Sequence, residues 1–238
     1  MQYSVQAKYS SLGYHEYMSL TAIERAKRIK LILFDVDGVL TNGQIWLFPA
    51  PAGAATASAD TAAGIHKLEE KGGYAIKSGT TVEAKGFHAH DGTSISLARL
   101  GGMKCGVITK RISETVALRA RDLRLEYIYM GQAHKMNAVN EIMAKEGITL
   151  EEIAYVGDDI IDLPVMRVCG LAIAVKNARE LVKQTAQYIT PNAGGEGAGR
   201  DAVEFILAAK GLLDKVTEEY IDERSEAAAA ADIGQGGM

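Results

Sequence analysis

The chain has 238 residues, of which 47% are hydrophobic and 24% charged, so it is long enough to bury the core of one globular domain. Its net charge is −4, and its 26 basic residues are scattered, which excludes the basic stripe of a nucleic-acid-binding protein. The longest uncharged stretch, Val39–Ala59, contains prolines and glycines and does not suit a membrane span. Cys105 and Cys169 form no Cys-x-x-Cys pair. We therefore expect a protein of the reducing cytoplasm that binds neither nucleic acid nor membrane.

Residues 1–29 are expected to be an N-terminal extension, after which short apolar runs alternate with helical patterns. The runs are typical of strands buried on both faces of a sheet, and they lie at Lys30–Phe34, Cys105–Ile108, Tyr127–Tyr129, Ile153–Val156 and Leu171–Val175. Helices are predicted at Ser94–Leu100, with Asp91 as N-cap, and at Ser113–Asp122, Lys135–Glu146 and Leu163–Val168. This alternation predicts an α/β fold with a doubly wound parallel sheet over residues 30–215.

An insertion at about residues 44–87 interrupts this rhythm. Gln44–Phe48 and Thr80–Phe87 are expected to pair as a two-stranded flap, with a loop at Phe48–Gly64 and a short helix at Ile65–Lys71. We expect a small flap and no large cap domain. Residues 216–238 are expected to form a partly disordered C-terminal tail.

Two carboxylates follow the first predicted strand, in Leu31-Ile-Leu-Phe-Asp-Val-Asp-Gly-Val-Leu-Thr41. Ligands of open α/β sheets gather at the carboxyl ends of strands. There Asp35 could attack phosphorus and form a covalent aspartyl phosphate, while Asp37 protonates the leaving oxygen and later takes a proton from water. The competing interpretation is an ordinary Asp-Gly turn.

A second acidic cluster makes the turn interpretation weaker. In Tyr155-Val-Gly-Asp-Asp-Ile-Ile-Asp162, another predicted strand ends at Asp158 and Asp159. Magnesium prefers hard oxygen ligands and would neutralise carboxylates that otherwise repel one another. One of these acids could instead be a helix N-cap. Thr109, at a third strand end, could donate a hydrogen bond to phosphate, and Lys135 could supply fixed positive charge.

The order of these motifs resembles the haloacid dehalogenase superfamily from about Lys30 to Lys210. Within it, the chain resembles the small-cap sugar-acid phosphatases. The matching pieces are Phe34-Asp-Val-Asp-Gly-Val-Leu-Thr41, Phe87-His-Ala-His-Asp-Gly92, Val156-Gly-Asp-Asp-Ile-Ile-Asp-Leu-Pro-Val-Met166 and Ala193-Gly-Gly-Glu-Gly-Ala-Gly-Arg-Asp201.

The resemblance implies a phosphatase with Asp35 as nucleophile and Asp37 as general acid and base. It implies Mg²⁺ held by the Asp35 carboxylate, the Asp37 backbone carbonyl and Asp158. Thr109 and Lys135 become phosphate ligands. Asp159 would orient the metal ligands or Lys135, and Asp162 would likewise lie behind the residues that contact the metal and the phosphate. A homotetramer is also implied.

The substrate implied is a sugar-acid phosphate, with 3-deoxy-D-manno-octulosonate 8-phosphate first. His90 and Glu196 stand where the sugar-acid group has arginines, and Lys110 replaces a glycine. We list His90, Lys110, Arg111, Glu196 and Arg200 as candidate substrate-binding residues. His88 and His90 are expected on one face of a strand. Losing two arginines predicts lower selectivity for the sugar carboxylate.

Three alternatives stay open. The first is a phosphatase of another small phosphorylated metabolite, and the second is a non-catalytic sugar-phosphate-binding relative. The third is a phospho-accepting receiver domain, in which the acidic pair precedes the phosphorylated aspartate. Here Asp35 and Asp37 come first and the second acidic cluster last, so the chain order favours the phosphatase.

Overall fold

The computed structural model of the chain describes residues 21–50, 64–67, 74–77 and 81–222. Six parallel strands form the central sheet, in the order β11-β10-β9-β1-β6-β8. In chain order they are β1 (Leu31–Phe34), β6 (Lys104–Ile108), β8 (Tyr127–Tyr129), β9 (Ile153–Gly157), β10 (Leu171–Ala174) and β11 (Tyr188–Ile189). The chain builds outward from β1 through β6 and β8, then returns to the other side of β1. This is the doubly wound α/β fold that the sequence predicted.

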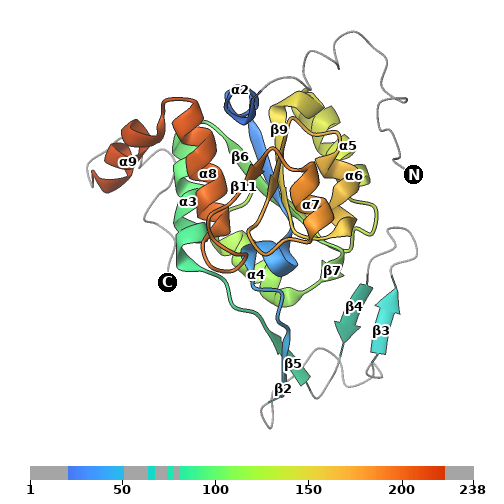
Figure 1. The fold of residues 1–238 in the computed structure, drawn as a ribbon. Coiled ribbons are helices and arrows are strands. Elements are labelled where there is room, and N and C mark those ends of the chain that lie inside the picture. Colours follow the sequence, from blue (N-terminus) through green and yellow to red (C-terminus); the bar gives the residue numbers. More distant parts are fainter. Residues whose placement is uncertain (1–20, 51–63, 68–73, 78–80, 223–238) are drawn as a thin grey trace, which may run out of the picture.

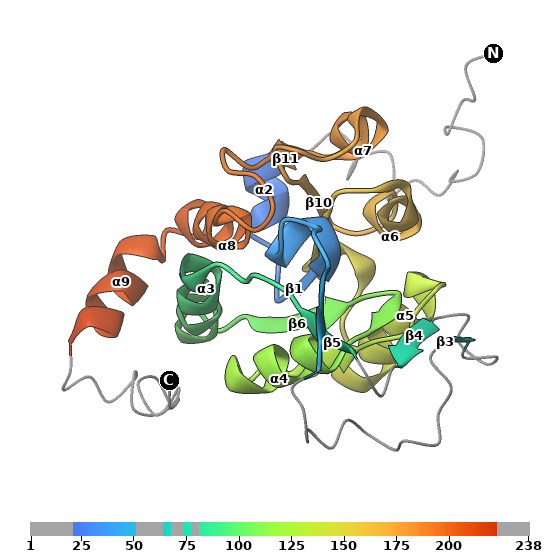
Figure 2. The ribbon, with the colours of Figure 1, turned by 90° about the horizontal axis from the view of Figure 1, so that it is seen from below.

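Helices cover both faces of the sheet (Figures 1 and 2). On one side α3 (Ala89–Leu100) packs against α8 (Ala198–Ala209), with α2 (Ala22–Ala26) beside α8, and on the other α5 (Lys135–Glu146) packs against α6 (Leu163–Met166). The remaining helices are α4 (Glu114–Asp122), α7 (Glu180–Thr185) and α9 (Leu213–Ile221). Because both faces are covered, every residue of β1, β9 and β10 is buried, which explains their uninterrupted apolar sequences.

The strands of the insertion form one small sheet by themselves and a second one together with β7, both beyond the carboxyl end of the central sheet (Figure 1). As predicted, β2 (Trp46–Pro49) and β5 (Thr81–Ala84) pair antiparallel, and we call this pair the flap. The second sheet holds β3 (Gly64–Lys67), β4 (Tyr74–Lys77) and β7 (Arg111–Ile112). The helix predicted at Ile65–Lys71 is wrong over Ile65–Lys67, because this backbone pairs with β4. Residues 51–63 of the predicted loop, residues 68–71 of the predicted helix, residues 1–20 and residues 223–238 lie outside the described residues. Residues 216–221 of the expected tail belong to the helix α9.

The start of α3 differs from the prediction. His88, rather than Asp91, is the N-cap, and its ring nitrogen accepts a hydrogen bond from the His90 backbone 3.3 Å away. The two histidines therefore lie at a helix start, with their rings edge to face, and not along a strand. Asp91 is buried in the first turn of α3 and accepts a hydrogen bond from the Arg200 backbone. Asp91 caps the neighbouring helix α8, so the prediction that it caps its own helix α3 is wrong.

Two observations bear on the composition-based expectations. Within the described ranges, no helix combines the length and apolar character needed to cross a membrane. Cys105 and Cys169 are both buried free thiols.

Candidate active site

Polar side chains follow three neighbouring strands where each strand ends. Asp35 follows β1, Thr109 follows β6 and Asp158 follows β9, and β1 lies between the other two strands. Parallel neighbours end at the same edge of a sheet, so the three residues meet there. They line a cavity of about 200 Å³ together with Asp37, Ile45, Lys110, Arg111, Asp159 and Ile161.

Asp35 lies in a buried network with an ammonium at its centre. Lys135 Nζ lies 2.8 Å from Asp35 Oδ1, 2.7 Å from Asp162 Oδ1 and 3.0 Å from the Tyr155 hydroxyl. Tyr155 in turn donates to Asp162 Oδ1 at 2.9 Å. Burial raises the pKa of Asp35 to about 6, against the stabilising charge of Lys135. Burial also opposes the charge of Lys135, but Asp35 and Asp162 together raise the pKa of its ammonium.

Asp158 provides a test of whether the site suits a metal ion. Oxygens of Asp35, Asp158 and Asp162 lie within 4.8 Å of one another, which is a donor set that fits a hard divalent cation. Asp162 is already engaged, because its Oδ2 accepts from the backbone nitrogens of Asp158 and Asp159. Asp158 Oδ1, by contrast, is buried and has no hydrogen-bond partner among the described residues. Burial and the neighbouring acid Asp35 raise the pKa of Asp158 to about 8, as expected for carboxylates crowded together.

The glycine after the paired acids has a steric role here. Gly38 has a φ of 99°, and a Cβ at this position would lie 2.2 Å from Asp158 Oδ2. The turn Val36–Leu40 (η2) therefore brings backbone close to Asp158. Glycine at this position serves the acidic site as well as the turn.

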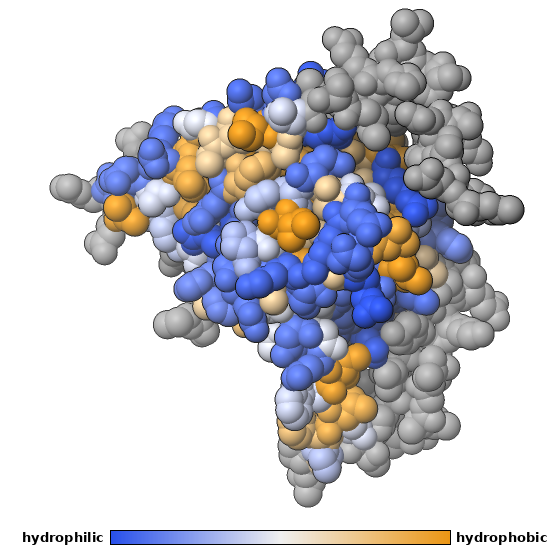
Figure 3. All heavy atoms as spheres, in the orientation of Figure 1, coloured by the Kyte–Doolittle hydropathy of each residue, from blue (hydrophilic) through white to orange (hydrophobic). Residues whose placement is uncertain are grey.

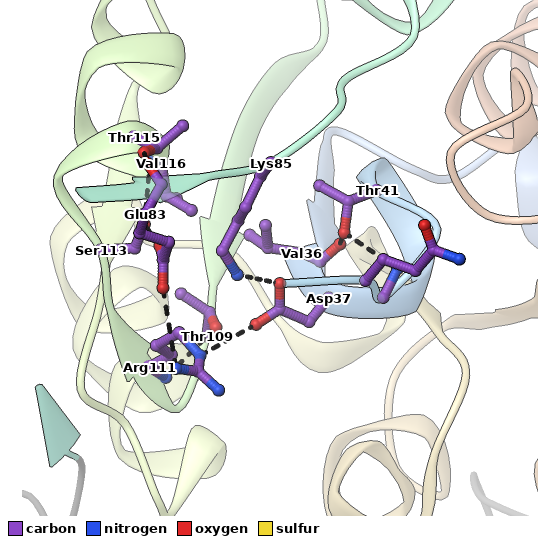
Figure 4. Close-up of polar contacts among 12 residues, drawn as sticks. Val36, Asp37, Thr41, Glu83, Lys85, Thr109, Arg111, Ser113, Thr115 and Val116 are labelled. Atoms are coloured by element: carbon purple, nitrogen blue, oxygen red, sulfur yellow. Dashed lines mark hydrogen bonds and ion pairs between the residues drawn. The ribbon is translucent and has the colours of Figure 1, made fainter. Parts of the chain in front are cut away.

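Asp37 lies between two cations (Figure 4). Its Oδ1 forms an ion pair with Lys85, and its Oδ2 lies 3.5 Å from Arg111 Nε. Arg111 also approaches Glu83, with 3.7 Å between Nη1 and Oε2. Lys85 and Glu83 come from the flap side, while Arg111 comes from the loop after β6. The flap is thus joined electrostatically to the second acid of the site.

The segment after β6 lines the cavity through three residues. Thr109 is buried and its Oγ1 accepts a long hydrogen bond, 3.4 Å, from the Arg111 backbone. Lys110 is half-buried. The backbone of Arg111 is fixed by β4, which pairs with β7 at Tyr74 and Ala75. The insertion therefore helps to place Arg111.

The remaining candidates lie in other places. Asp159 is exposed, accepts from the Ile160 backbone and begins the short turn Ile160–Asp162 (η4), so Asp162 rather than Asp159 contacts Lys135. His90, Glu196 and Arg200 do not line the cavity. Arg200 instead pairs with Glu204 on its own helix.

Three residues that belong to this site are not predicted from the sequence, namely Lys85, Glu83 and Tyr155. Tyr155 is an inward residue of an apolar strand, where a tyrosine is indistinguishable from core. Glu83 belongs to the flap and Lys85 directly follows it, and no motif among the central strands points to either residue.

Comparison with known proteins agrees with this geometry. The sequence profile of the haloacid dehalogenase-like hydrolases matches residues 108–199. The 3-deoxy-D-manno-octulosonate 8-phosphate phosphatase of Escherichia coli K12 is 32% identical over 204 residues, which cover 86% of this chain and 93% of the relative. The Moraxella catarrhalis phosphatase of the same name, crystallised with magnesium, phosphate and KDO, has a TM-score of 0.66 at 32% identity over 84% of this chain and 97% of that one. The cobalt-bound Haemophilus influenzae phosphatase has a TM-score of 0.63 at 27% identity, over 86% of this chain and 99% of that one.

Fold, site and relatives together define the class. The chain belongs to the haloacid dehalogenase-like hydrolases, and it is a phosphatase, as the sequence predicted. Within that class, the relatives that it matches over most of its length include 3-deoxy-D-manno-octulosonate 8-phosphate phosphatases.

Proposed function

We propose that this phosphatase is a magnesium-dependent phosphomonoesterase that works through an aspartyl phosphate on Asp35. Its leading substrate is 3-deoxy-D-manno-octulosonate 8-phosphate. The observation that carries the proposal is the meeting of Asp35, Asp37, Thr109 and Asp158 around one cavity, with Lys135 bound to Asp35 behind it. The relatives' names support the substrate.

The proposed reaction has two displacements at phosphorus. In the first, an Asp35 carboxylate oxygen forms a bond to phosphorus, the bond to the sugar oxygen breaks, and Asp37 gives that oxygen a proton. In the second, Asp37 takes a proton from a water molecule whose oxygen attacks phosphorus, and Asp35 leaves. Thr109 donates a hydrogen bond to a phosphoryl oxygen, and the Lys135 ammonium offsets negative charge around Asp35.

Magnesium fits the acidic cluster on its chemistry. The Asp35 and Asp158 carboxylates and the Asp37 backbone carbonyl would hold it, while Asp162 orients Lys135 and the backbone of Asp158. A bound divalent cation supplies positive charge that lets Asp35, Asp158 and the substrate phosphate approach one another.

Recognition of the sugar acid falls to cations that line the cavity. Lys110 and Arg111 lie there, whereas His90 and Glu196, at positions where the sugar-acid group has arginines, do not. Arg111 has the planar donor geometry that suits a carboxylate. We therefore expect activity on sugar-acid phosphates with modest selectivity.

A substrate panel tests this function. Purified protein with magnesium is assayed on 3-deoxy-D-manno-octulosonate 8-phosphate, a nine-carbon 2-keto sugar-acid phosphate and neutral sugar phosphates. We expect turnover of the acidic esters, loss of all turnover after chelation and its return on adding magnesium. Better turnover of the neutral esters would leave a phosphatase of another metabolite. A single phosphorylation without turnover would favour a receiver-like role, and binding without either reaction would favour a non-catalytic relative.

We also propose that the phosphatase is a cytoplasmic homotetramer in which flaps meet neighbouring protomers. Trp46, Leu47 and Phe48 are all about half exposed, so both faces of β2 are apolar and open. Figure 3 shows apolar side chains gathered over this part of the molecule. A two-stranded ribbon is marginally stable alone in water, and an apolar patch of this kind is typical of an interface.

A further inference from the structure

Lys85 is the second buried lysine of the site. Among the lysines whose side chains the structure describes, Lys85 and Lys135 are the two that are buried. Their side chains are 0% and 1% exposed. Each forms an ion pair with one acid of the Asp35-Val-Asp37 motif, Lys135 with Asp35 and Lys85 with Asp37. A buried ammonium is costly unless it is paired, so its position depends on the carboxylate that it contacts.

The backbone that carries Lys85 is fixed at the adjacent end of the flap. Glu83, two residues earlier on the same side of the chain, accepts a hydrogen bond from the Ser113 hydroxyl. The Thr115 hydroxyl donates to the Glu83 backbone carbonyl at 3.2 Å. These contacts tie the flap to the start of α4 (Figure 4). Lys85 therefore reaches Asp37 from an anchored strand end.

The two oxygens of Asp37 are held unequally. Oδ1 is in direct contact with the buried Lys85 ammonium, whereas Oδ2 is 3.5 Å from Arg111 Nε and belongs to a side chain that lines the cavity. Because the two oxygens of a carboxylate are joined to one carbon, a contact that holds one oxygen also limits where the other can point. Oδ2 is thus the less closely held of the two oxygens, on a side chain that lines the cavity.

We propose that Lys85 is a positioning residue for Asp37, holding Oδ1 so that Oδ2 meets the leaving oxygen of the ester. This inference rests on the proposed role of Asp37 as the general acid. Lys85 touches no reacting atom. Its loss would leave the attack by Asp35 possible but would misplace the proton donor, and misplacements of about 1 Å cost enzymes on the order of 10²-fold.

The test compares two esters of similar shape, phenyl phosphate and p-nitrophenyl phosphate, with magnesium present. Phenolate is the more basic leaving group and needs the proton more. We expect Lys85→Met to lower kcat/KM for phenyl phosphate about tenfold more than for p-nitrophenyl phosphate, as a misplaced acid predicts. Lys85→Arg, which keeps the charge, should recover part of this loss. Lys104→Met, at an exposed lysine that pairs with Glu146, is the control and should change neither ester.

Asp37→Asn separates the acid role of Asp37 from the positioning role of Lys85. It should also lower kcat/KM more for phenyl phosphate than for p-nitrophenyl phosphate, by a larger ratio than Lys85→Met does. If Asp37→Asn slows both esters equally, the acid role of Asp37 is wrong and this inference falls with it. If Asp37→Asn is selective but Lys85→Met slows both esters equally or neither, only the role of Lys85 is overturned. If Lys85→Met does not unfold cooperatively on heating, and so is not properly folded, Lys85→Gln is used for the same comparison of the two esters.

Discussion

Asp35 and Asp37 are two residues apart but lie in different surroundings. Asp35 is buried against Lys135 and close to the other acids of the cluster, whereas Asp37 is one-quarter exposed beside Lys85 and Arg111. A buried carboxylate among other acids suits attack on phosphorus, and a partly exposed carboxylate that lines the cavity suits proton exchange with a leaving group and water. The different environments are consistent with the different roles proposed.

Asp35→Asn should abolish both turnover and formation of the covalent phosphoenzyme, because the amide cannot attack phosphorus. Asp37→Asn should slow turnover by about 10²–10⁴-fold, since it removes proton transfer from both steps. Turnover of the leading substrate and trapping of labelled phosphoprotein check these outcomes, with magnesium present. Near-normal rates in either variant would show that its assigned role is wrong.

Tyr155→Phe should reduce the free energy of unfolding by about 2 kcal/mol, since the lost hydroxyl bonds two charged groups, Lys135 and Asp162, in a buried site. Urea unfolding measures this. Tyr129→Phe is the matched control, because its hydroxyl bonds Glu141 at an exposed position and should matter less. Equal effects in the two variants would contradict the importance of the buried network.

At the residue scale, strand-end carboxylates were predictable because chemistry and position coincide. Asp35, Thr109 and Asp158 each follow an apolar run that ends abruptly, and a parallel sheet brings such ends together. Lys85 was not predictable, since its contact with Asp37 spans 48 residues and depends on how the flap docks. The resemblance predicts His90 and Glu196 as substrate-binding residues, but the three-dimensional packing leaves both outside the cavity.

At the scale of elements, Asp91 joins two helices. Its carboxylate is buried in α3 and accepts from the backbone at the start of α8. Burial raises the pKa of Asp91 from 3.8 to about 6, in spite of the hydrogen bond from Arg200. The folded state therefore binds a proton that the unfolded state has released between these two pH values.

The sign of the resulting pH dependence follows directly. The raised pKa of Asp91 contributes stability that is complete below about pH 3.8 and is lost as the pH rises through about 6. Between about pH 7.5 and about pH 5, wild type should gain about 1.4 kcal/mol relative to Asp91→Asn, which does not titrate. Urea unfolding of both proteins with magnesium measures the difference. A difference that does not vary with pH would show that Asp91 titrates normally.

Element prediction succeeded where apolar runs were bounded by turn residues. Tyr127–Tyr129 and Lys135–Glu146 have the predicted limits, and the flap pairs as expected. Prediction failed at Ile65–Lys67, because a short segment can be helical or extended and its pairing with β4 decided the outcome. The beginning of α3 was misplaced because Asp91 caps another helix.

At the scale of the whole molecule, the cavity has no cover from the described residues comparable to a cap domain. The flap lies beyond the carboxyl end of the sheet (Figure 1). Its aromatic rings Trp46 and Phe48 are stacked on each other and about half exposed. The proposed aspartyl phosphate is a reactive acyl phosphate, so the site benefits from exclusion of bulk water. A second copy of the chain seated on the flap would supply both the exclusion and the burial of the apolar surface.

Replacing Trp46 and Phe48 together by serine should therefore break the proposed tetramer into smaller species. Both rings are about half exposed in the protomer, so their removal should leave its fold intact while the interface loses apolar area. Light scattering at assay concentration gives the mass, and turnover should fall as the assembly dissociates. Ile23→Ser is the control, because Ile23 is 53% exposed on α2, at the opposite end of the sheet from the flap (Figure 1). A wild-type protein that is monomeric and fully active, or a double variant that remains assembled, would contradict an interface at the flap.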